Sequence, residues 1–355
     1  MIRTLLTLLL LAAPLHATPL YAQGFAGLGT QADGFATPTP DPTFTFPLDH
    51  GPHPDYRIEW WYLTATLTGP DGTSYGVQWT LFRGALTPET SDNWTAPQLF
   101  MGHAGLTTPD AHFSAERLGR GGIGQAGVTI HPFRAFIDDW QMVSTASEGD
   151  ALDALTVTAR GAEFAYDLAL TATGPLVFHG ENGYSVKSNE GQASYYYSQP
   201  FYQVTGQLDL PDGPVQVTGT AWLDREYSSQ PLSDTQSGWD WFSLQFEDGA
   251  RMMAFALHDG TGTPFTSGTW IAPDGTTQSY GDGAISLTPL STTQVAGREV
   301  PTTWRLQVPD RAIDITTIPL NPQSWMATSF PYWEGPITFT GTHQGRGYLE
   351  MTGYD

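Results

Sequence analysis

The chain has 355 residues, with 14 basic and 36 acidic side chains, a formal net charge of −22 and no cysteine. So negative a charge excludes sequence-independent binding to nucleic acid, which needs clustered lysine and arginine side chains. The absence of cysteine excludes disulfides, thiolate nucleophiles, iron–sulfur clusters and cysteine-ligated zinc, and the single lysine, Lys187, nearly excludes lysine chemistry.

The N-terminal residues have the pattern of a secretory signal peptide. Arg3 precedes an apolar run over residues 5–13, and small-residue cleavage sites end at Ala17 and Ala22. The alternative, an N-terminal membrane anchor, is disfavoured because the run is short and Pro14 interrupts it. We therefore expect cleavage after Ala17 or Ala22, a signal peptide over residues 1–22, and a secreted or periplasmic mature protein. Without cysteine the protein is not a lipoprotein.

Residues 23–43 are rich in glycine and proline and predict an extended linker. From about residue 44 onward, apolar and polar residues alternate with a period of two, which indicates strands. Tight hairpin turns need the positive φ angles that Asp-Gly pairs supply. Such pairs begin at Asp71, Asp212, Asp248, Asp259, Asp274 and Asp282. Glycine and proline interrupt almost every window that could hold an amphipathic helix, so the sequence predicts an all-β protein of antiparallel sheet.

A weak internal repeat divides the strand pattern. Residues 59–63 recur as residues 240–244, and two further pairs of similar segments follow in the same order. Ordered matches favour two copies of one β unit over a coincidence of short aromatic-rich strings. The boundary falls in the polar stretch 228–237, so we expect domains over residues 44–228 and 229–355. Each domain would close into a barrel or pack as a sandwich, because closure removes exposed sheet edges.

The first chemically informative stretch, residues 50–62, joins a proline-rich turn to a strand with three consecutive aromatic residues. Because successive side chains of a strand point to opposite faces, both faces of this strand carry a large ring. The pattern predicts either a cavity wall with Glu59 at its rim or a domain core combined with an inter-domain contact. A metal site at His50 and His53 is disfavoured because no helix or strand fixes them, and we expect no bound metal.

The second stretch, residues 221–228, carries two acids that strand alternation places on one face, Asp224 and Glu226. Two carboxylates in one site raise the pKa of one of them, which keeps a carboxylic acid protonated near neutral pH. The alternative is structural: Arg225 pairs with Asp240 or Glu59 and closes a domain junction. Asp240 also lies between two tryptophans in the sequence, and burial against them would raise its pKa.

Two further positions serve either a ligand or the packing of a core. His103 lies among small residues that leave room for a ligand, and the alternative is a structural histidine bonded to a backbone carbonyl. The aromatic run at residues 195–197 forms either a second cavity wall or part of a core. The sequence contains no serine nucleophile elbow, phosphate loop, dinucleotide fingerprint or zinc-protease motif.

A series of ordered motifs resembles the AttH family. One of them reads Glu59-Trp60-Trp61-Tyr62, and another reads Trp222-Leu223-Asp224-Arg225-Glu226-Tyr227-Ser228. The motifs cover residues 53–62, 78–83, 102–104, 138–140, 183–187, 193–198, 222–228, 238–242 and 345–350. The resemblance runs from about residue 44 to the C-terminus and implies two lipocalin-like antiparallel β-barrel domains packed together.

Bacterial members of the AttH family are often described as predicted secreted hydrolases, and the family is distantly related to carotenoid 1,2-hydratases. Those hydratases add water to a terminal isoprenoid double bond. The sequence contains no nucleophile motif that would support a hydrolase. If the protein is an enzyme, the resemblance therefore implies a hydro-lyase rather than a nucleophile-dependent hydrolase. Where the hydratases carry histidine and asparagine after the aspartate, this chain has Arg225-Glu226-Tyr227 after Asp224.

The first functional hypothesis is a secreted lipocalin-like protein that binds an extended apolar ligand, a lipid or an isoprenoid. Such a ligand would lie in an aromatic-lined cavity with a few polar groups. The ligand-binding candidates are Trp60, Trp61, Tyr62, Arg83, Tyr195, Tyr197, Arg225, Trp239 and Trp241.

The second hypothesis is an enzyme that hydrates or cyclises an alkene after protonation by a carboxylic acid, without a cofactor. Its catalytic candidates are Asp240, Glu226, Asp224, Glu59 and His103. The third hypothesis is an accessory protein of envelope transport, whose partner is a membrane transporter or another cell-envelope protein.

Overall fold

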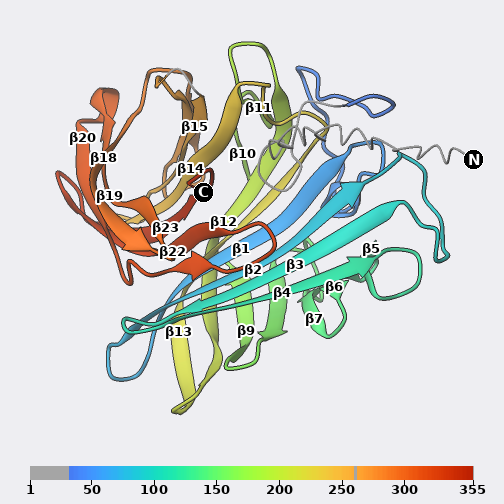
Figure 1. Cartoon of the computed structure of the whole chain (residues 1–355), viewed down its shortest axis with the longest axis horizontal. Coiled ribbons are helices and arrows are strands. Elements are labelled where there is room, and N and C mark those ends of the chain that lie inside the picture. The colour runs from blue at the N-terminus through green and yellow to red at the C-terminus, as the bar shows by residue number, and fades with distance from the viewer. Residues whose placement is uncertain (1–31, 260–261, 355) are drawn as a thin grey trace, which may run out of the picture.

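The computed structural model describes residues 32–259 and 262–354, and almost all of their regular structure is β-strand (Figure 1). The expected signal peptide, residues 1–22, and the first part of the linker lie outside the described residues. Within the described ranges the helices are two short 3-10 turns, η2 (Leu48–His50) and η3 (Pro309–Arg311). In this part of the chain, no helix has the length and apolar character that crossing a membrane requires.

The first sheet has 13 strands in the order β4-β3-β2-β1-β13-β12-β9-β8-β7-β6-β5, with β10 and β11 also paired to β12. The strands are β1 (Ile58–Thr68), β2 (Ser74–Ala85), β3 (Gln98–Thr107), β4 (His112–Arg120), β5 (Ala126–Ile130), β6 (Phe133–Ile137), β7 (Trp140–Ser144), β8 (Ala154–Arg160), β9 (Ala165–Ala172), β10 (Val177–Phe178), β11 (Tyr184–Val186), β12 (Ala193–Leu210) and β13 (Gly213–Ser228). The sheet curls so that β4, at one edge, contacts β6 near the other. Gly119 of β4 allows this approach, because a Cβ there would lie only 3.1 Å from Ala126 of β5.

The second sheet has 10 strands in the order β17-β16-β15-β14-β23-β22-β20-β19-β18, with β21 also paired to β22. The strands are β14 (Gln236–Phe246), β15 (Arg251–Asp259), β16 (Phe265–Ile271), β17 (Thr277–Tyr280), β18 (Ser286–Val295), β19 (Arg298–Val308), β20 (Ile313–Pro319), β21 (Trp325–Met326), β22 (Tyr332–Gly341) and β23 (Gly345–Met351). Their pairings are antiparallel, as they are in the first sheet.

The two curled antiparallel sheets form barrel-like domains packed against each other, which confirms the predicted fold class. In each sheet the first strand pairs with both the second strand and the last one: β1 with β2 and β13, and β14 with β15 and β23. The two copies of the sequence repeat, on β1 and β14, therefore occupy equivalent places. The chain passes from one sheet to the other between Ser228 and Gln236.

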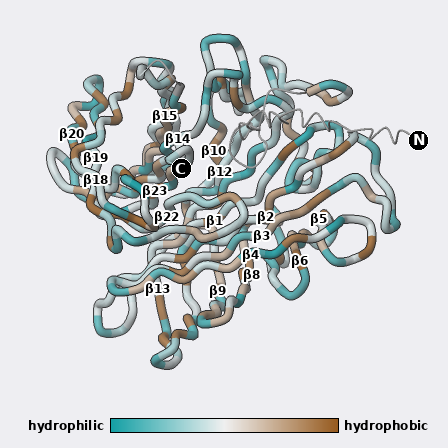
Figure 2. Tube along the Cα trace, in the orientation of Figure 1, coloured by the Kyte–Doolittle hydropathy of each residue, from teal (hydrophilic) through white to brown (hydrophobic). Residues whose placement is uncertain are grey.

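Three clusters of buried side chains hold the molecule together. One fills the interior of the first sheet, one fills the second, and a third lies between them with members from both. In Figure 2 the hydrophobic brown segments follow strands of both sheets, and many of the loops are teal. Strands β22 and β23 lie against β2 and β1 (Figure 1), so the central strands of the first sheet are buried on both faces.

Strand β1 shows how the alternation divides its aromatic residues between two clusters. Trp61 is fully buried and packs in the core of the first barrel. Trp60 and Tyr62 point to the opposite face and join the cluster between the sheets. The three consecutive aromatic residues therefore reflect a strand that packs against its own barrel on one side and the second domain on the other.

Candidate functional site

A cavity lies between the two sheets, beside the cluster that joins them. It contains about 680 Å³ of empty space, with the open solvent at its mouth included. Its wall is formed by β1, β2, β12 and β13 of the first sheet, by β14, β15 and β23 of the second, and by the segments that precede β12 and β14. The wall residues are Trp60, Tyr62, Phe82, Lys187, Tyr196, Asp224, Glu226, Pro231, Leu232, Trp239, Trp241, Phe255, Leu257 and Glu350.

Asp224, on β13, is a buried acid of the cavity wall. Tyr196 donates a hydrogen bond to its Oδ2 over 2.6 Å, and Trp222 and Ser198 donate to its Oδ1, with a Trp222 distance of 2.5 Å. Burial raises the pKa of Asp224 to about 7, with a further contribution from Glu226, even though these three hydrogen bonds favour the ionised form. Asp224 can therefore gain or lose a proton close to neutral pH.

Glu226, two residues further along β13, faces the same cavity and forms an ion pair. The Nζ atom of Lys187 lies 2.7 Å from its Oε1, and Ser194 donates a hydrogen bond to the same oxygen. The Lys187 ammonium also lies 4.3 Å from the centre of the Phe255 ring and 4.8 Å from that of Tyr196. The pair is thus enclosed by aromatic rings from both sheets.

A second pair of acids, Glu334 on β22 and Glu350 on β23, lies directly opposite each other in the second sheet. Trp239 donates to Glu350 over 2.6 Å, and Tyr62 of the first sheet donates to Glu334 over 2.6 Å. Burial raises the pKa of Glu350 to about 7, with smaller contributions from Asp224 and Glu226. Burial and the neighbouring Glu350 raise the pKa of Glu334 well above its usual range.

Trp241 connects the second sheet to the Asp224 site. Its Nε1–H donates to the Tyr196 hydroxyl over 3.0 Å, and that hydroxyl in turn donates to Asp224. Its indole ring also meets Tyr62 edge-on, with ring centres 5.2 Å apart. The cavity therefore combines an aromatic wall with carboxyl groups that titrate near pH 7. The described residues contain no group of three or more His, Asp or Glu side chains placed to hold a metal ion.

Residues 37–354 match the model of the AttH-like family. The chain belongs to this family. A solved structure from Nitrosomonas europaea, described as an AttH, is 32% identical and superposes with a TM-score of 0.80, covering 90% of this chain and 100% of that one. A comparison with curated proteins found no match.

Two more distant solved structures share the fold of this AttH-like chain. Kievitone hydratase from Nectria haematococca is 17% identical, with a TM-score of 0.67 and coverage of 92% of this chain and 98% of that one. CghA, solved with Sch210972, is 12% identical, with a TM-score of 0.55 and the same coverage. At these identities the likeness concerns the fold alone.

The cavity of this AttH-like chain brings together six of the residues that the sequence singles out. They are Trp60, Tyr62, Asp224, Glu226, Trp239 and Trp241. The other candidates lie elsewhere, in three separate places. Glu59 and Arg225 are neighbours in one of these places, whereas His103 and Asp240 lie in the other two.

Asp240 does not face the cavity, contrary to its place among the catalytic candidates. Its neighbours Trp239 and Trp241 both line the cavity, so the alternation of β14 sends Asp240 to the opposite face. There its carboxylate lies 2.9 Å from Nε2 of His258 and accepts a hydrogen bond from Tyr354 over 2.8 Å. Burial does raise the pKa of Asp240, as the sequence suggests, but at a site outside the cavity.

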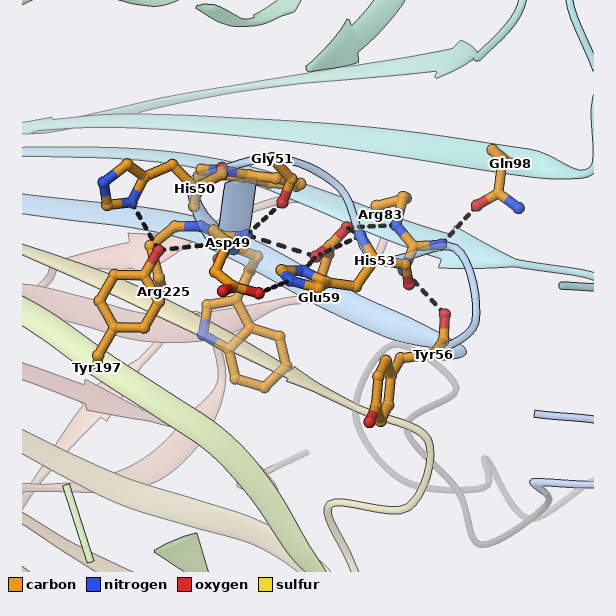
Figure 3. A network of polar contacts seen from close by, with 12 residues as sticks. Asp49, His50, Gly51, His53, Tyr56, Glu59, Arg83, Gln98, Tyr197 and Arg225 are labelled. Atoms are coloured by element: carbon orange, nitrogen blue, oxygen red, sulfur yellow. Dashed lines mark hydrogen bonds and ion pairs between the residues drawn. The ribbon is translucent and has the colours of Figure 1, made fainter. Parts of the chain in front are cut away.

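Glu59, Arg83 and Arg225 form a buried network that Figure 3 shows. Arg83 Nε lies 2.6 Å from Glu59 Oε1, and Arg225 Nη2 lies 3.4 Å from its Oε2. Arg225 also donates to the carbonyl oxygens of Gly51 and Trp60, over 2.9 and 2.6 Å. This network therefore fastens the segment before β1 to the barrel, and Glu59 is the acid that pairs with Arg225.

The remaining aromatic candidates pack around the same segment. Trp61 lies under the Arg225 guanidinium at 3.9 Å and donates to the carbonyl of His50 over 2.9 Å. Tyr197 donates to the carbonyl of Asp49 over 2.8 Å. The Tyr195 hydroxyl accepts a hydrogen bond from the backbone N–H of Thr39, in the linker, over 3.0 Å. None of these three rings lines the cavity.

His103 lies at another part of the contact between the sheets. Its Nδ1 is 3.0 Å from the Tyr332 hydroxyl of β22, and its Nε2 is 3.2 Å from Glu116. Burial lowers its pKa, which favours the neutral imidazole of a structural histidine. His50 and His53 likewise use both ring nitrogens in protein contacts, with Tyr197, Asp150, Asp49 and Glu59 as partners.

Lys187, Tyr196 and Glu350 line the cavity but are absent from the candidates, which include Tyr195 and Tyr197 from the aromatic run 195–197. Tyr196 stands directly opposite Glu226 in the β12–β13 register, so it shares the face of the two acids while Tyr195 and Tyr197 face away. The signal that could have identified Tyr196 is its pairing with Glu226 when β12 and β13 are aligned as neighbouring antiparallel strands. Lys187 and Glu350 belong to the motifs at residues 183–187 and 345–350, but only the packing of the sheets brings them to the cavity.

Proposed function

We propose that this protein binds an extended apolar small molecule, a lipid or an isoprenoid, in the cavity between its two sheets. The observation that carries the proposal is the composition of the wall, in which aromatic and aliphatic side chains from both sheets surround a few polar groups. Sites for small molecules have this character, because apolar surface supplies affinity and a few polar groups fix orientation. CghA, a protein of the same fold, has a crystal structure solved with Sch210972, and this supports the proposal.

The cavity also favours ligand binding over a purely structural role in envelope transport. An accessory protein that only contacts a transporter needs a packed interior, not an aromatic space with buried acids at its wall. We keep export across the membrane as part of the proposal on the basis of the N-terminal apolar run.

Filling the cavity is expected to abolish binding. Leu257, on β15 opposite Trp239, lines the cavity and is buried, so Leu257→Trp places an indole in the ligand's space. We expect protein purified from its own host to carry a small molecule in native mass spectrometry, and Leu257→Trp to carry none. The matched control is Leu290→Trp, the same substitution at an exposed position. Equal occupancy of the two variants would place the ligand outside this cavity.

A second candidate function is hydration of an alkene, and the carboxyl groups of Asp224 and Glu350 favour it. A carboxylic acid with a pKa of about 7 can donate a proton at neutral pH and accept one afterwards. Its O–H bond breaks as a C–H bond forms on the alkene, which leaves a carbocation on the adjacent carbon. Faces of Trp60, Trp239 and Trp241 would stabilise that cation by about 1–2 kcal/mol each. Water then adds, and its proton returns to the carboxylate.

Asp224→Asn is expected to abolish such turnover and to retain ligand. The amide cannot donate the proton, while the shape of the side chain is conserved. Turnover is measured as incorporation of oxygen-18 from labelled water into isoprenoid alkenes, and retention of ligand by native mass spectrometry. Asp240→Asn serves as the control, because Asp240 lies outside the cavity. If Asp224→Asn hydrates alkenes as fast as the natural protein, Asp224 is not the acid.

A further inference from the structure

Lys187 is the only lysine of the chain, and its place in the cavity wall is fixed by two other segments. Its backbone N–H donates to the carbonyl of Gln192 over 2.7 Å. Its own carbonyl accepts a hydrogen bond from Gln236, at the start of β14, over 2.8 Å. The backbone of Lys187 is therefore anchored where the first sheet meets the second, and its side chain lines the cavity.

The charge of Lys187 is already neutralised by one partner. Its ammonium lies 2.7 Å from Glu226, and the side chains of Lys187 and Glu226 are only 8% and 7% exposed. A buried ion pair loses much of its stability when one member is drawn away, because the other is left as an uncompensated charge. An incoming anion would therefore have to compete with Glu226 for the ammonium group.

The other ionisable groups of the cavity wall are acids. Asp224 and Glu350 line the same space, and Lys187 is the only cationic side chain among the lining residues. Above pH 7 both acids carry negative charge for most of the time. A ligand carboxylate would then meet like charges in a desolvated site, which weakens its binding.

A neutral oxygen meets no such penalty. An ammonium group has three N–H donors, so a hydroxyl or carbonyl oxygen can accept from Lys187 while Glu226 keeps its own contact. We propose that the Lys187–Glu226 pair selects the polar end of the ligand, admitting an apolar molecule that ends in a hydroxyl or carbonyl oxygen and rejecting one that ends in a carboxylate. This inference rests on the proposed function and names its ligand class more closely.

The test uses three retinoids that share one polyene and differ at its end: retinol, methyl retinoate and retinoic acid. Binding is followed at pH 8 by quenching of the tryptophan fluorescence, since three tryptophans line the cavity. We expect retinol and methyl retinoate to bind with dissociation constants within about threefold of each other. Retinoate should bind about tenfold more weakly than its own methyl ester, or worse.

Removing the carboxylate of the pair should abolish this preference. In Glu226→Gln the ammonium of Lys187 is free to bind an anion, so we expect retinoate to gain about tenfold in affinity while retinol changes little. The double variant Lys187→Met/Glu226→Gln, which lacks both charges, should lose that gain. Circular dichroism checks that each variant is folded. If a variant does not fold, the comparison of retinoate with methyl retinoate on the natural protein still tests the inference.

Two results would overturn the inference: retinoate that binds as tightly as methyl retinoate, or Glu226→Gln that leaves the affinity for retinoate unchanged. Failure of the proposed function looks different. In that case retinol, methyl retinoate and the neutral dye Nile red all fail to bind. Alternatively, all three bind to Leu257→Trp as tightly as to the natural protein.

Discussion

Glu59→Gln is expected to lower the free energy of unfolding by about 3–5 kcal/mol, the cost of leaving buried charges without their partner. Glu59 is fully buried and lies within 2.6 Å of Arg83 and 3.4 Å of Arg225, which are also buried. Burial alone would raise its pKa, but Arg83, His53 and Arg225 hold the pKa of Glu59 well below its usual range. The glutamine keeps the shape of the side chain and removes the charge that both guanidinium groups need.

Urea unfolding followed by tryptophan fluorescence measures the effect. Glu163→Gln is the matched control, since Glu163 is exposed and its replacement should change stability by less than about 0.5 kcal/mol. A Glu59→Gln variant as stable as the control would mean that the network in Figure 3 contributes nothing to the fold.

Glu350→Gln is expected to stabilise the protein above pH 7 by about 3 kcal/mol and to have little effect near pH 4. Burial raises the pKa of Glu350 from its ordinary value of 4.5 to about 7. A carboxyl whose folded pKa is raised contributes its stability in full below the unfolded pKa. That stability is lost as the pH rises from about 4.5 to about 7, because the folded state resists ionisation. Glutamine is neutral throughout and does not suffer the loss.

The measurement is the midpoint of thermal unfolding of both proteins between pH 4 and pH 9. Glu163→Gln again provides the control, with a pH profile parallel to that of the natural protein. A Glu350→Gln profile that also runs parallel would show that Glu350 is already ionised without cost in the folded state.

The pH profile of the natural protein has an opposing trend at its acid end. Burial alone would raise the pKa values of Glu59 and Asp150, but hydrogen bonds and charges of nearby arginine or histidine side chains lower them. Hydrogen bonds from His103 and Ser329 lower the pKa of Glu116. The stability that these groups contribute is present above their unfolded pKa and is lost as the pH falls. Maximum stability therefore lies between the two trends.

Local sequence was sufficient to predict the strands and the faces that their side chains share. Alternation placed Asp224 and Glu226 together, and both carboxyl groups line the cavity. The same rule, applied to Asp240, would have separated it from Trp239 and Trp241, because adjacent residues of a strand point to opposite faces. Treating neighbours in sequence as neighbours in space produced that error.

Only the tertiary structure determined which strand faces of the first sheet pack against the second domain. Period-two alternation cannot say whether Tyr196, or Tyr195 and Tyr197, faces the second domain, since each choice buries aromatic rings. The register of β12 on β13 settles it by setting Tyr196 opposite Glu226. Glu350, more than a hundred residues away, then completes the cavity from the second sheet.

What the sequence determined is thus the all-β architecture, the repeated unit and the composition of each strand face, because these depend on residues a few positions apart. Which faces meet, and so which acids are buried beside Lys187, depends on the docking of two sheets. Docking is governed by the shape and burial of surfaces that strands from distant parts of the chain build together, and no local period encodes it.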